Sequence, residues 1–449
     1  MKRFFAFAGV DRPTFYTLAG RGFTVVSGVV TLFMVAQFLS HEEQGYYYTF
    51  SSLLAMQLLF ELGMSYVVMQ FASHEAAHLH WGDSGVMLGD AASLSRLRSL
   101  ALLVFKWYAA ISAIIVVVVV PAGWIMFANA PHQAEVHWRF AWSWLILSTA
   151  LNVFILPLLA LLEGCGKITE VSRMRMFQNV FGSALAWAAL LNHGGLIALP
   201  AMNTGIALVA LGWLVGSKLP FFRDLLKRAI PGETMHWRTE IWPFQWKIAV
   251  SSLSSYFSYH LFTPITFYFC GAVDAGRIGM SITATNALTT VAMAWMNTKA
   301  PRFGALVAKR DYATLDRLFN FVLSRSLTVI VLLGALLGVA NLLLHAEANR
   351  LADRLLMPGA FFVLIAATVC NYVVYALSTY LRAHKEDPFM TLNLASAVVT
   401  SALSLVLVQA YGTMGIVCGY LAISVLVGLG WGSHIFAAKR RQWRGIAAA

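Results

Sequence analysis

The chain has 449 residues, of which 59% are apolar and only 12% are charged, and its formal net charge is +12. Soluble domains average about 25% charged residues, so the composition excludes an ordinary soluble protein and indicates an integral membrane protein. The four cysteines lie far apart and form no CxxC pair, which argues against a disulfide framework or a cysteine metal site.

Hydrophobic runs long enough to cross a bilayer recur from one end of the sequence to the other. No small-residue cleavage site follows the basic N-terminal start, so we predict that the first span is an uncleaved anchor. In chain order we predict twelve spans, near residues 14–39, 46–71, 100–127, 138–162, 173–192, 196–217, 247–270, 277–297, 318–344, 358–381, 389–409 and 413–437.

The basic residues divide unequally between the two sides of these spans. The N-terminus, the loops after even-numbered spans and the C-terminus together carry 27 of the 32 Lys and Arg residues. The other connections carry four, and the remaining one, Arg21, lies inside the first span. By the positive-inside rule, both termini are predicted to be cytoplasmic. This topology explains the net charge without a nucleic-acid partner.

The largest inward segment, residues 218–246, is basic and is interrupted by Pro and Trp. We interpret it as an amphipathic linker at the cytoplasmic surface, between a six-helix lobe of residues 1–217 and a second of residues 247–449. The outward loops are too short to hold a catalytic domain. The sequence has no nucleophile elbow, phosphate-binding glycine loop or metal motif, so we expect neither an enzyme nor a bound cofactor.

Three short motifs indicate that the second lobe repeats the first. DAASLSRL at 90–97 aligns with DYATLDRL at 311–318, EQG at 43–45 aligns with DAG at 274–276, and LGW recurs at 211–213 and 429–431. Six spans in each repeat give both halves the same orientation, as in two-lobed transporters with a cavity between the lobes. We therefore predict an all-α polytopic protein with twelve transmembrane helices in two six-helix lobes, related by a parallel repeat around a central cavity.

The first lobe has about ten more residues between its paired motifs than the second lobe has. They fall in ASHEAAHLHWGDSG, which contains His74, His78 and His80. His74 and His78 have the i, i+4 spacing of two metal ligands on a helix, but polar loop surface is the favoured interpretation and no metal is predicted.

Two charges of opposite sign lie deep in the predicted membrane. Arg21 is roughly 10 Å and Glu61 roughly 15 Å from the cytoplasmic end of their spans, at 1.5 Å per residue. A charge at the bilayer centre is costly, so neither side chain is expected to face lipid alone. One interpretation is a structural ion pair between them. The other is that Arg21 binds a phosphate group in a cavity, while Glu61 orients Arg21 or carries a proton.

Further polar side chains follow the same spans and are predicted to line the cavity. Thr24 shares a stripe with Arg21, and Gln57 shares a face with Glu61. The seventh span, equivalent to the first, carries a polar stripe in which packing roles are the alternative, and Pro264 is expected to kink it. The cavity candidates in that stripe are Ser252, Tyr256 and His260, and weaker candidates elsewhere are Asn286, Asn371 and Tyr375.

Several segments resemble the polysaccharide (O-antigen type) flippases of the multidrug/oligosaccharidyl-lipid/polysaccharide exporter superfamily. They span most of the chain in the expected order and include EEQGYYYTFSSLLAMQLLFELGMSYVVMQFAS (42–73), LLEGCGKITEVSRMRMFQN (161–179), EIWPFQWKIAVSSLSSY (240–256), DAGRIGMSITATNALTTVAMAWMNTKAPRFGALVAKRD (274–311) and YLRAHKEDPF (380–389). Family cavities are cationic, which Arg21 matches, although this sequence has few other intramembrane cations.

The resemblance implies a flippase that moves a polyprenyl-diphosphate-linked oligosaccharide from the inner to the outer leaflet of the bacterial inner membrane. The implied partners are this lipid-linked substrate, membrane lipid and the polysaccharide polymerase machinery. A multidrug exporter of the same superfamily is the nearest alternative. A polytopic polysaccharide polymerase or ligase should have a larger outward loop, and a non-transporting scaffold would not need the polar stripes.

Overall fold

The computed structural model describes residues 12–55, 57, 61, 63–129, 136–227, 234–242, 245–246, 260–384, 386 and 388–448. The chain divides into two compact units. Unit 1 comprises residues 1–39, 54–129 and 135–253, and unit 2 comprises residues 40–53, 130–134 and 254–449. Residues 40–53 come from the sequence predicted to form the first lobe, yet they pack in unit 2.

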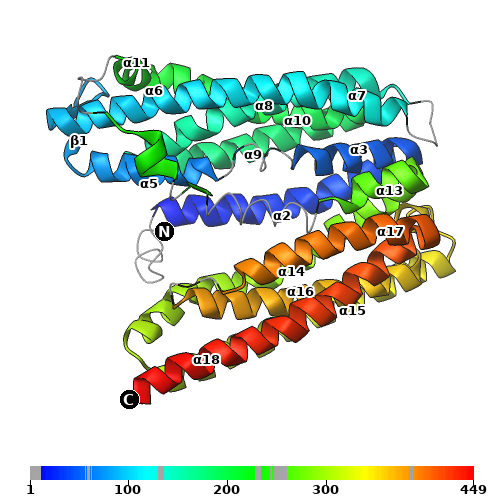
Figure 1. Cartoon of the computed structure of the whole chain (residues 1–449). Helices are drawn as coiled ribbons and strands as arrows, with labels where there is room; N and C mark the ends of the chain where they lie inside the picture. Colours follow the sequence, from blue (N-terminus) through cyan, green and yellow to red (C-terminus); the bar gives the residue numbers. More distant parts are fainter. Residues whose placement is uncertain are drawn as a thin grey trace. The chain divides into compact units, whose positions relative to one another are not determined.

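Unit 1 consists of long helices and one small hairpin (Figure 1). Helix α8 is the most buried element of unit 1, because it carries apolar residues on nearly all of its faces. Helix α9 packs against both α2 and α10. In chain order the elements are α2 (Arg12–Phe38), α5 (Met64–Ala76), β1 (Leu79–Trp81), β2 (Met87–Gly89), α6 (Ala91–Ile114), η1 (Ile115–Val119), α7 (Val120–Ala128), α8 (Trp138–Gly164), α9 (Ile168–Leu191), η2 (Gly195–Ile197), α10 (Ala198–Trp213), η3 (Leu214–Lys218), α11 (Leu219–Leu225) and η4 (Trp237–Ile241).

Unit 2 is built in the same way around α16, whose apolar side chains pack against α14, α15 and α17. Helix α17 contains a kink at Gly412, which has a φ of 59° that only glycine adopts readily. The elements are α3 (His41–Leu54), α13 (Phe262–Cys270), α14 (Ala272–Ala308), α15 (Tyr312–Ala346), η5 (Ala352–Arg354), α16 (Pro358–Arg382), α17 (Met390–Ile423), η6 (Ser424–Trp431) and α18 (Gly432–Ala448).

Most of the described helices coincide with predicted spans. Among the described residues, six helices are long and apolar enough to cross a membrane, at 91–128, 138–164, 195–225, 312–346, 358–382 and 390–445. The last of these holds both of the final predicted spans, since Gly412 separates them. The seventh predicted span is described only from residue 260, and its residues 247–259 lie outside the described residues.

The second predicted span is not one continuous helix. Helix α3 ends at Leu54, and α5 begins at Met64 after Gly63, whose φ of 67° lies in the left-handed region. The chain also passes from unit 2 to unit 1 between residues 53 and 54. Irregular backbone at membrane depth is tolerated only where protein or a water-filled cavity surrounds it, and it marks substrate pathways in transporters.

The extra residues of the first lobe form a β-hairpin rather than an open loop. Its strands β1 and β2 pair antiparallel, with Trp81 opposite Met87. The Trp81 indole donates a hydrogen bond to the carbonyl oxygen of Cys165 at 2.8 Å and contacts the ring of Phe221 at 5.0 Å. The Lys167 ammonium lies 4.5 Å from the centre of the Trp81 ring. Trp81 therefore anchors the hairpin to the end of unit 1.

Two of the repeated motifs occupy equivalent structural positions. Asp90 accepts a hydrogen bond from the backbone N–H of Ser93 at 2.8 Å, and Asp311 accepts one from Thr314 at 3.0 Å. Each aspartate is therefore the N-cap of a long helix, α6 in unit 1 and α15 in unit 2. The LGW motifs both border π-helical turns, since the first directly precedes η3 and the second ends η6. Such turns are rare and occur frequently at functional sites.

The two glycines of the third repeated motif contact each other. Helix α3 crosses α14 so closely that a Cβ on Gly45 would overlap the carbonyl oxygen of Ala272, and one on Gly276 would lie 3.0 Å from the Gly45 nitrogen. The Gln44 amide donates hydrogen bonds to the carbonyl oxygens of Gly276 and Arg354, each at 3.0 Å. Small residues permit such close approach between membrane helices.

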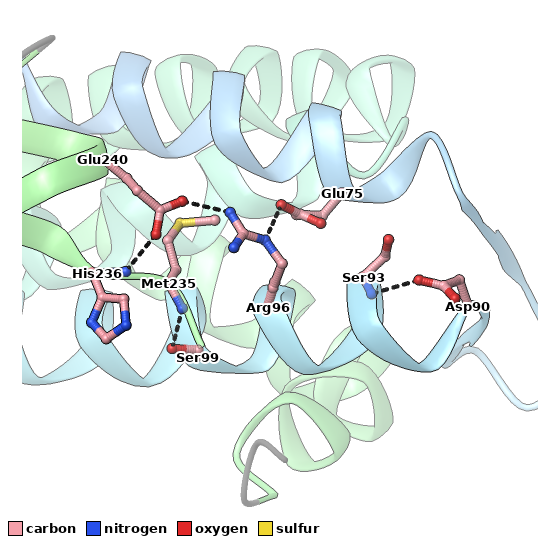
Figure 2. A network of polar contacts seen from close by, with 8 residues as sticks. All are labelled: Glu75, Asp90, Ser93, Arg96, Ser99, Met235, His236 and Glu240. Carbon is pink, nitrogen blue, oxygen red and sulfur yellow. Dashed lines mark hydrogen bonds and ion pairs between the residues drawn. The ribbon is translucent and has the colours of Figure 1, made fainter. Parts of the chain in front are cut away.

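The predicted linker is partly a continuation of the sixth span. Residues 195–225 form one uninterrupted helical stretch, in which Phe221, Phe222 and Leu225 are buried and Arg223 is exposed. Further along, the turn η4 returns to unit 1 and is held there by the network in Figure 2. Two described parts of the linker, α11 and η4, therefore pack against unit 1.

Candidate functional site

Arg96 of α6 connects three elements at the end of unit 1 (Figure 2). Its Nε donates to Glu75 of α5 at 2.8 Å, and its Nη2 donates to Glu240 of η4 at 2.6 Å. Glu240 also accepts a hydrogen bond from the backbone N–H of His236 at 2.8 Å. This bond and the pairing with Arg96 hold the pKa of Glu240 below its ordinary value of 4.5. The network is structural, because it ties the linker to unit 1.

The predicted ion pair between Arg21 and Glu61 stays a prediction, because the Arg21 side chain lies outside the described residues. Its backbone belongs to α2. Thr24, three residues further along, donates a hydrogen bond to the Gly20 carbonyl oxygen at 2.9 Å and accepts one from Asn179 of α9 at 3.4 Å. Thr24 thus faces α9 while remaining exposed, so the cavity-lining role predicted for it stays a prediction.

Gln57 and Glu61 both occupy the segment between α3 and α5. Gln57 is exposed and Glu61 is half-buried. The Glu61 carboxylate interacts electrostatically with Tyr108 of α6, whose hydroxyl lies 3.3 Å from the Ser65 Oγ. Tyr108 itself is fully buried. The partner recorded for Glu61 among the described residues is therefore the buried Tyr108, whose hydroxyl also contacts Ser65 near the backbone break at Gly63.

The candidates of the seventh span are described only at its end. Ser252 and Tyr256 lie outside the described residues. His260 is half-buried and, together with Leu261, is not helical. Helix α13 begins at Phe262, so Pro264 lies in its first turn, where proline is tolerated. The kink expected at Pro264 is therefore not found at that residue.

A polar pocket in unit 2 was not predicted as a site. It has a volume of about 260 Å³ and lies between α16, α17 and η6. Nine of its fourteen lining residues are polar, and none is a carboxylate. The lining consists of Asn371, Val374, Tyr375, Ser378, Arg382, Phe389, Leu392, Asn393, Ser396, Thr400, Tyr420, Ile423, Ser424 and Gly428. We refer to it as the unit 2 pocket.

One wall of the unit 2 pocket is fixed by hydrogen bonds. The Asn371 amide donates to the Ala367 carbonyl oxygen at 2.8 Å and to the Ser424 Oγ at 2.6 Å. Ser424 in turn donates to the Tyr420 carbonyl oxygen at 2.7 Å and begins the π-helical turn η6. Because both amide protons are used, the Asn371 side chain has a defined orientation.

A polar stripe on α14 adjoins this pocket. Thr283, Asn286, Thr290 and Asn297 lie on one face of the helix and are all exposed. The Tyr375 hydroxyl, which lines the unit 2 pocket, donates to the Asn297 Oδ1 at 2.7 Å. The stripe and the pocket are thus joined within unit 2. The sequence indicated three of these residues, Asn286, Asn371 and Tyr375, only as weak candidates.

Unit 1 has a groove of different character. It has a volume of about 480 Å³, lies between α6, η1, α8 and α10, and is lined mostly by apolar side chains such as Val116, Leu147, Leu151 and Leu208. Ser148 at its wall donates its hydroxyl to the Leu145 carbonyl oxygen at 2.9 Å. The Ser148 hydroxyl therefore already has a hydrogen-bond partner within the protein.

The histidines of the hairpin region do not gather into a metal site. Among the described residues, no group of three or more His, Cys, Asp or Glu side chains is placed to hold a metal ion. His74, His78 and His80 are exposed.

Solved structures share the fold over nearly the whole chain. An inward-facing multidrug resistance transporter of the MATE family and MOP superfamily is 15% identical, with a TM-score of 0.63, over 93% of this chain and 99% of that one. An outward-facing one is 14% identical, with a TM-score of 0.55 and 96% of each chain covered. A MOP superfamily transporter from Pyrococcus furiosus is 14% identical, with a TM-score of 0.54 and 95% of each chain covered.

No family model and no curated protein matches the sequence. The structural likeness confirms the predicted fold class: this is a polytopic helical membrane protein with the fold of the MATE transporters.

Proposed function

We propose that the chain is an alternating-access transporter that moves a polyprenyl-diphosphate-linked oligosaccharide from the cytoplasmic to the outer leaflet of a bacterial inner membrane. The proposed role is transport rather than catalysis, with the N- and C-termini in the cytoplasm and the polymerase machinery as a partner. The observation that carries it is the exposed polar stripe of α14, which joins a hydroxyl- and amide-lined pocket. Helix surface that faces only lipid has no need of such groups.

The solved neighbours support alternating access. They include transporters of the same fold described as inward-facing and as outward-facing. The interruption of the second span at Gly63 agrees with this, because discontinuous helices mark the moving, substrate-binding parts of transporters.

The chemistry of the unit 2 pocket supports an anionic, hydroxyl-rich substrate. Its lining has no carboxylate, and its one charged residue is Arg382. A cationic drug would favour a carboxylate, whereas a diphosphate favours a guanidinium. In the Pyrococcus furiosus transporter, a binding pocket of reversed polarity suggests a different function, so pocket charge is a suitable criterion within this fold. Arg21 is the proposed diphosphate ligand in unit 1.

A multidrug exporter is the second candidate. It is favoured by the half-buried carboxylate of Glu61 at membrane depth, which could hold a cation, and by the multidrug resistance described for two of the neighbours. An exporter of cationic drugs would require Glu61 but not Arg21, and this difference separates the two functions.

The test is translocation of a fluorescent polyprenyl-diphosphate oligosaccharide in proteoliposomes. Arg21→Ala should slow translocation at least about tenfold, since a charge-assisted hydrogen bond contributes about 1.5–3 kcal/mol, while Arg21→Lys should retain part of the rate. Glu61→Gln distinguishes two roles of this residue. If Glu61 carries a proton, the variant should translocate more slowly, and if Glu61 only supports the structure, the variant should unfold at a lower temperature. A folded Arg21→Ala variant with the native rate would refute the phosphate-binding role.

A further inference from the structure

We infer that the unit 2 pocket is a saccharide subsite that binds one sugar ring of the substrate through hydrogen bonds. This inference rests on the proposed function for the chemical class of its ligand. It goes beyond that function in placing the sugar between α16, α17 and η6. Three observations carry it: unpartnered polar groups on one wall, fixed acceptors on the other, and the charge and size of the space between them.

The wall formed by α17 presents polar groups that no part of the described protein satisfies. Asn393, Ser396 and Thr400 follow one another at i, i+3 and i+7 and therefore share one face of the helix, which lines the pocket. Among the described residues, no hydrogen bond involves the side chains of these three residues. Thr400 is a buried residue whose hydroxyl oxygen nevertheless remains accessible, and the residue lines the pocket. Their partners must come from water or from a ligand inside the pocket.

The opposite wall offers acceptors in fixed positions. Asn371 uses both amide protons in bonds to Ala367 and Ser424, so its Oδ1 remains as an acceptor. The Tyr375 hydroxyl gives its proton to Asn297, so its oxygen is likewise an acceptor toward the pocket. Donors and acceptors on facing walls suit a ligand whose groups can both donate and accept hydrogen bonds. The hydroxyl groups of a sugar have this property.

The charge and the size of the unit 2 pocket further restrict the kind of ligand that it can bind. Without a carboxylate in its lining, the pocket has no group to neutralise a cation. Its volume of about 260 Å³ corresponds to roughly nine water molecules at about 30 Å³ each. This is slightly below the range of about 300–1,000 Å³ found for sites of drug-sized ligands, so the pocket suits one ring rather than an oligosaccharide.

The inference is tested by direct binding to the purified full-length protein in detergent. N-acetylglucosamine, galactose and glucose are titrated separately and followed by saturation-transfer NMR. We expect saturable binding of at least one of the three sugars. Thr400→Val, which replaces the hydroxyl by a methyl group of similar size, should weaken binding about fivefold, the equivalent of one hydrogen bond. Thr400→Ser, which keeps the hydroxyl, should bind like the native protein.

Ser401→Ala is the matched control. Ser401 neighbours Thr400 on α17 but is not part of the pocket lining, and its hydroxyl donates to the Ala397 carbonyl oxygen at 2.8 Å. Native sugar binding by this variant, with loss in Thr400→Val, supports the subsite. Equal loss in both variants overturns it. Each variant is first shown to unfold at the native temperature, and Asn393→Leu provides a second test from the same wall.

Two other probes identify the wrong ligand class. If inorganic phosphate binds in place of the sugars and is lost in Arg382→Gln, the pocket is an anion site and the inference is overturned. If tetraphenylphosphonium binds and is lost in Thr400→Val, the pocket takes cations and the inference is likewise overturned. Sugar binding without translocation of the lipid-linked substrate would refute the proposed function alone. Translocation by a protein that binds no sugar would refute the subsite alone.

Discussion

Units 1 and 2 join equivalent helix ends with ion pairs, but the charges stand in opposite order. In unit 1, Arg98 of α6 pairs with Asp224 of α11 at 2.9 Å. In unit 2, Asp316 of α15 pairs with Arg440 and Arg444 of α18. The first partner in each unit lies near the start of an aspartate-capped helix, and the second follows an LGW motif. In each unit an ion pair therefore ties an aspartate-capped helix to the helix after an LGW motif, but the paired residues do not align, since Asp316 corresponds to Ser95, three residues before Arg98.

The cavities of the two units differ more deeply. The groove of unit 1 is mostly apolar, and its Ser148 is satisfied internally, whereas the unit 2 pocket has polar side chains without partners among the described residues. A structural connection can exchange its residues freely as long as it holds, but a binding surface must match its ligand. We therefore assign the hydroxyl-rich part of the substrate to unit 2.

The largest effect is expected at the repeated glycines. Gly45→Ala would place a methyl group onto the backbone of Ala272, which cannot move aside as a flexible side chain could. We therefore expect the free energy of unfolding to fall by about 3 kcal/mol, or the protein not to fold. Gly276→Ala meets the Gly45 nitrogen at 3.0 Å and should cost less. Thermal unfolding in detergent measures both.

Gly28→Ala is the control for this pair. Gly28 lies within α2, and a Cβ there would meet nothing within 4 Å. Alanine is the better helix former, so the unfolding temperature should stay the same or rise slightly. If Gly45→Ala were as stable as Gly28→Ala, the close crossing of α3 and α14 would be wrong.

The reversed ion pairs should differ in strength. Asp316 binds Arg440 and Arg444 and also accepts a hydrogen bond from the Tyr380 hydroxyl at 2.9 Å. We expect Asp316→Asn to destabilise unit 2 by about 2 kcal/mol, because it weakens three bonds to a mostly buried carboxylate. Asp224→Asn should lower the free energy of unfolding by roughly half as much, since one partner of Asp224, Lys227, is largely exposed. Chemical denaturation of the two variants gives the order, and the reverse order would contradict the comparison.

Acidification should release α18 from unit 2 while leaving α11 in place. Burial lowers the pKa of His384, whose ring stacks on Trp443 of α18 at 3.7 Å. The docked helix therefore favours the neutral imidazole. The stabilisation that neutral His384 gives to the docked helix is present above the ordinary histidine pKa of 6.5. It is lost as the pH falls from 6.5 through the lowered pKa of His384 in the folded protein. The protection factors of residues 432–445, which correct the exchange rates for the slower intrinsic exchange at lower pH, should therefore fall between pH 7.5 and pH 5.

His384→Phe separates the titration from the stacking. It keeps an aromatic ring against Trp443 but has no titratable nitrogen, so the protection factors of α18 should become nearly independent of pH over this range. An unchanged pH dependence in this variant would assign the effect to another group, and Glu386, which pairs with Lys439 of α18 at 2.8 Å, would then be tested next.

The smallest effects are expected at the two helix caps, where the units are most alike. Hydrogen bonds from Ser93 and from Thr314 hold the pKa values of Asp90 and Asp311 below their ordinary value of 3.8. The stabilisation is thus present above pH 3.8 and is lost as the pH falls through the lower folded values. Asp90→Ala and Asp311→Ala should lower the unfolding temperature slightly and by similar amounts at pH 7. Unequal effects would show that the repeat has lost this equivalence.

Much of the fold could be predicted from the sequence because its signals are local. Apolar runs of about 20 residues predict spans, and the aspartate before a helix predicts a cap. The break before α5 could not be predicted, because a single glycine within an apolar run is also compatible with a continuous helix. The hairpin around Trp81 was missed because its strands have only three residues each.

The site was harder to predict than the fold. Asn393, Ser396 and Thr400 have helical spacing in the sequence, but Ser and Thr in membrane helices more often serve packing, so spacing alone gave no reason to select them. What distinguishes them is the absence of partners among the described residues, which depends on the neighbouring helices. The proposed role of Arg21 still rests on the sequence, since its side chain is not among the described ones.

The proposed transport function is tested most sharply by a competition between the two candidate substrate classes in one preparation of proteoliposomes. The vesicles contain a fluorescent polyprenyl-diphosphate oligosaccharide and are supplied with a cationic dye. We predict translocation of the lipid-linked oligosaccharide that is slowed by Arg21→Ala and unaffected by the dye. Transport of the dye, with no movement of the oligosaccharide and dependence on Glu61 alone, would contradict it.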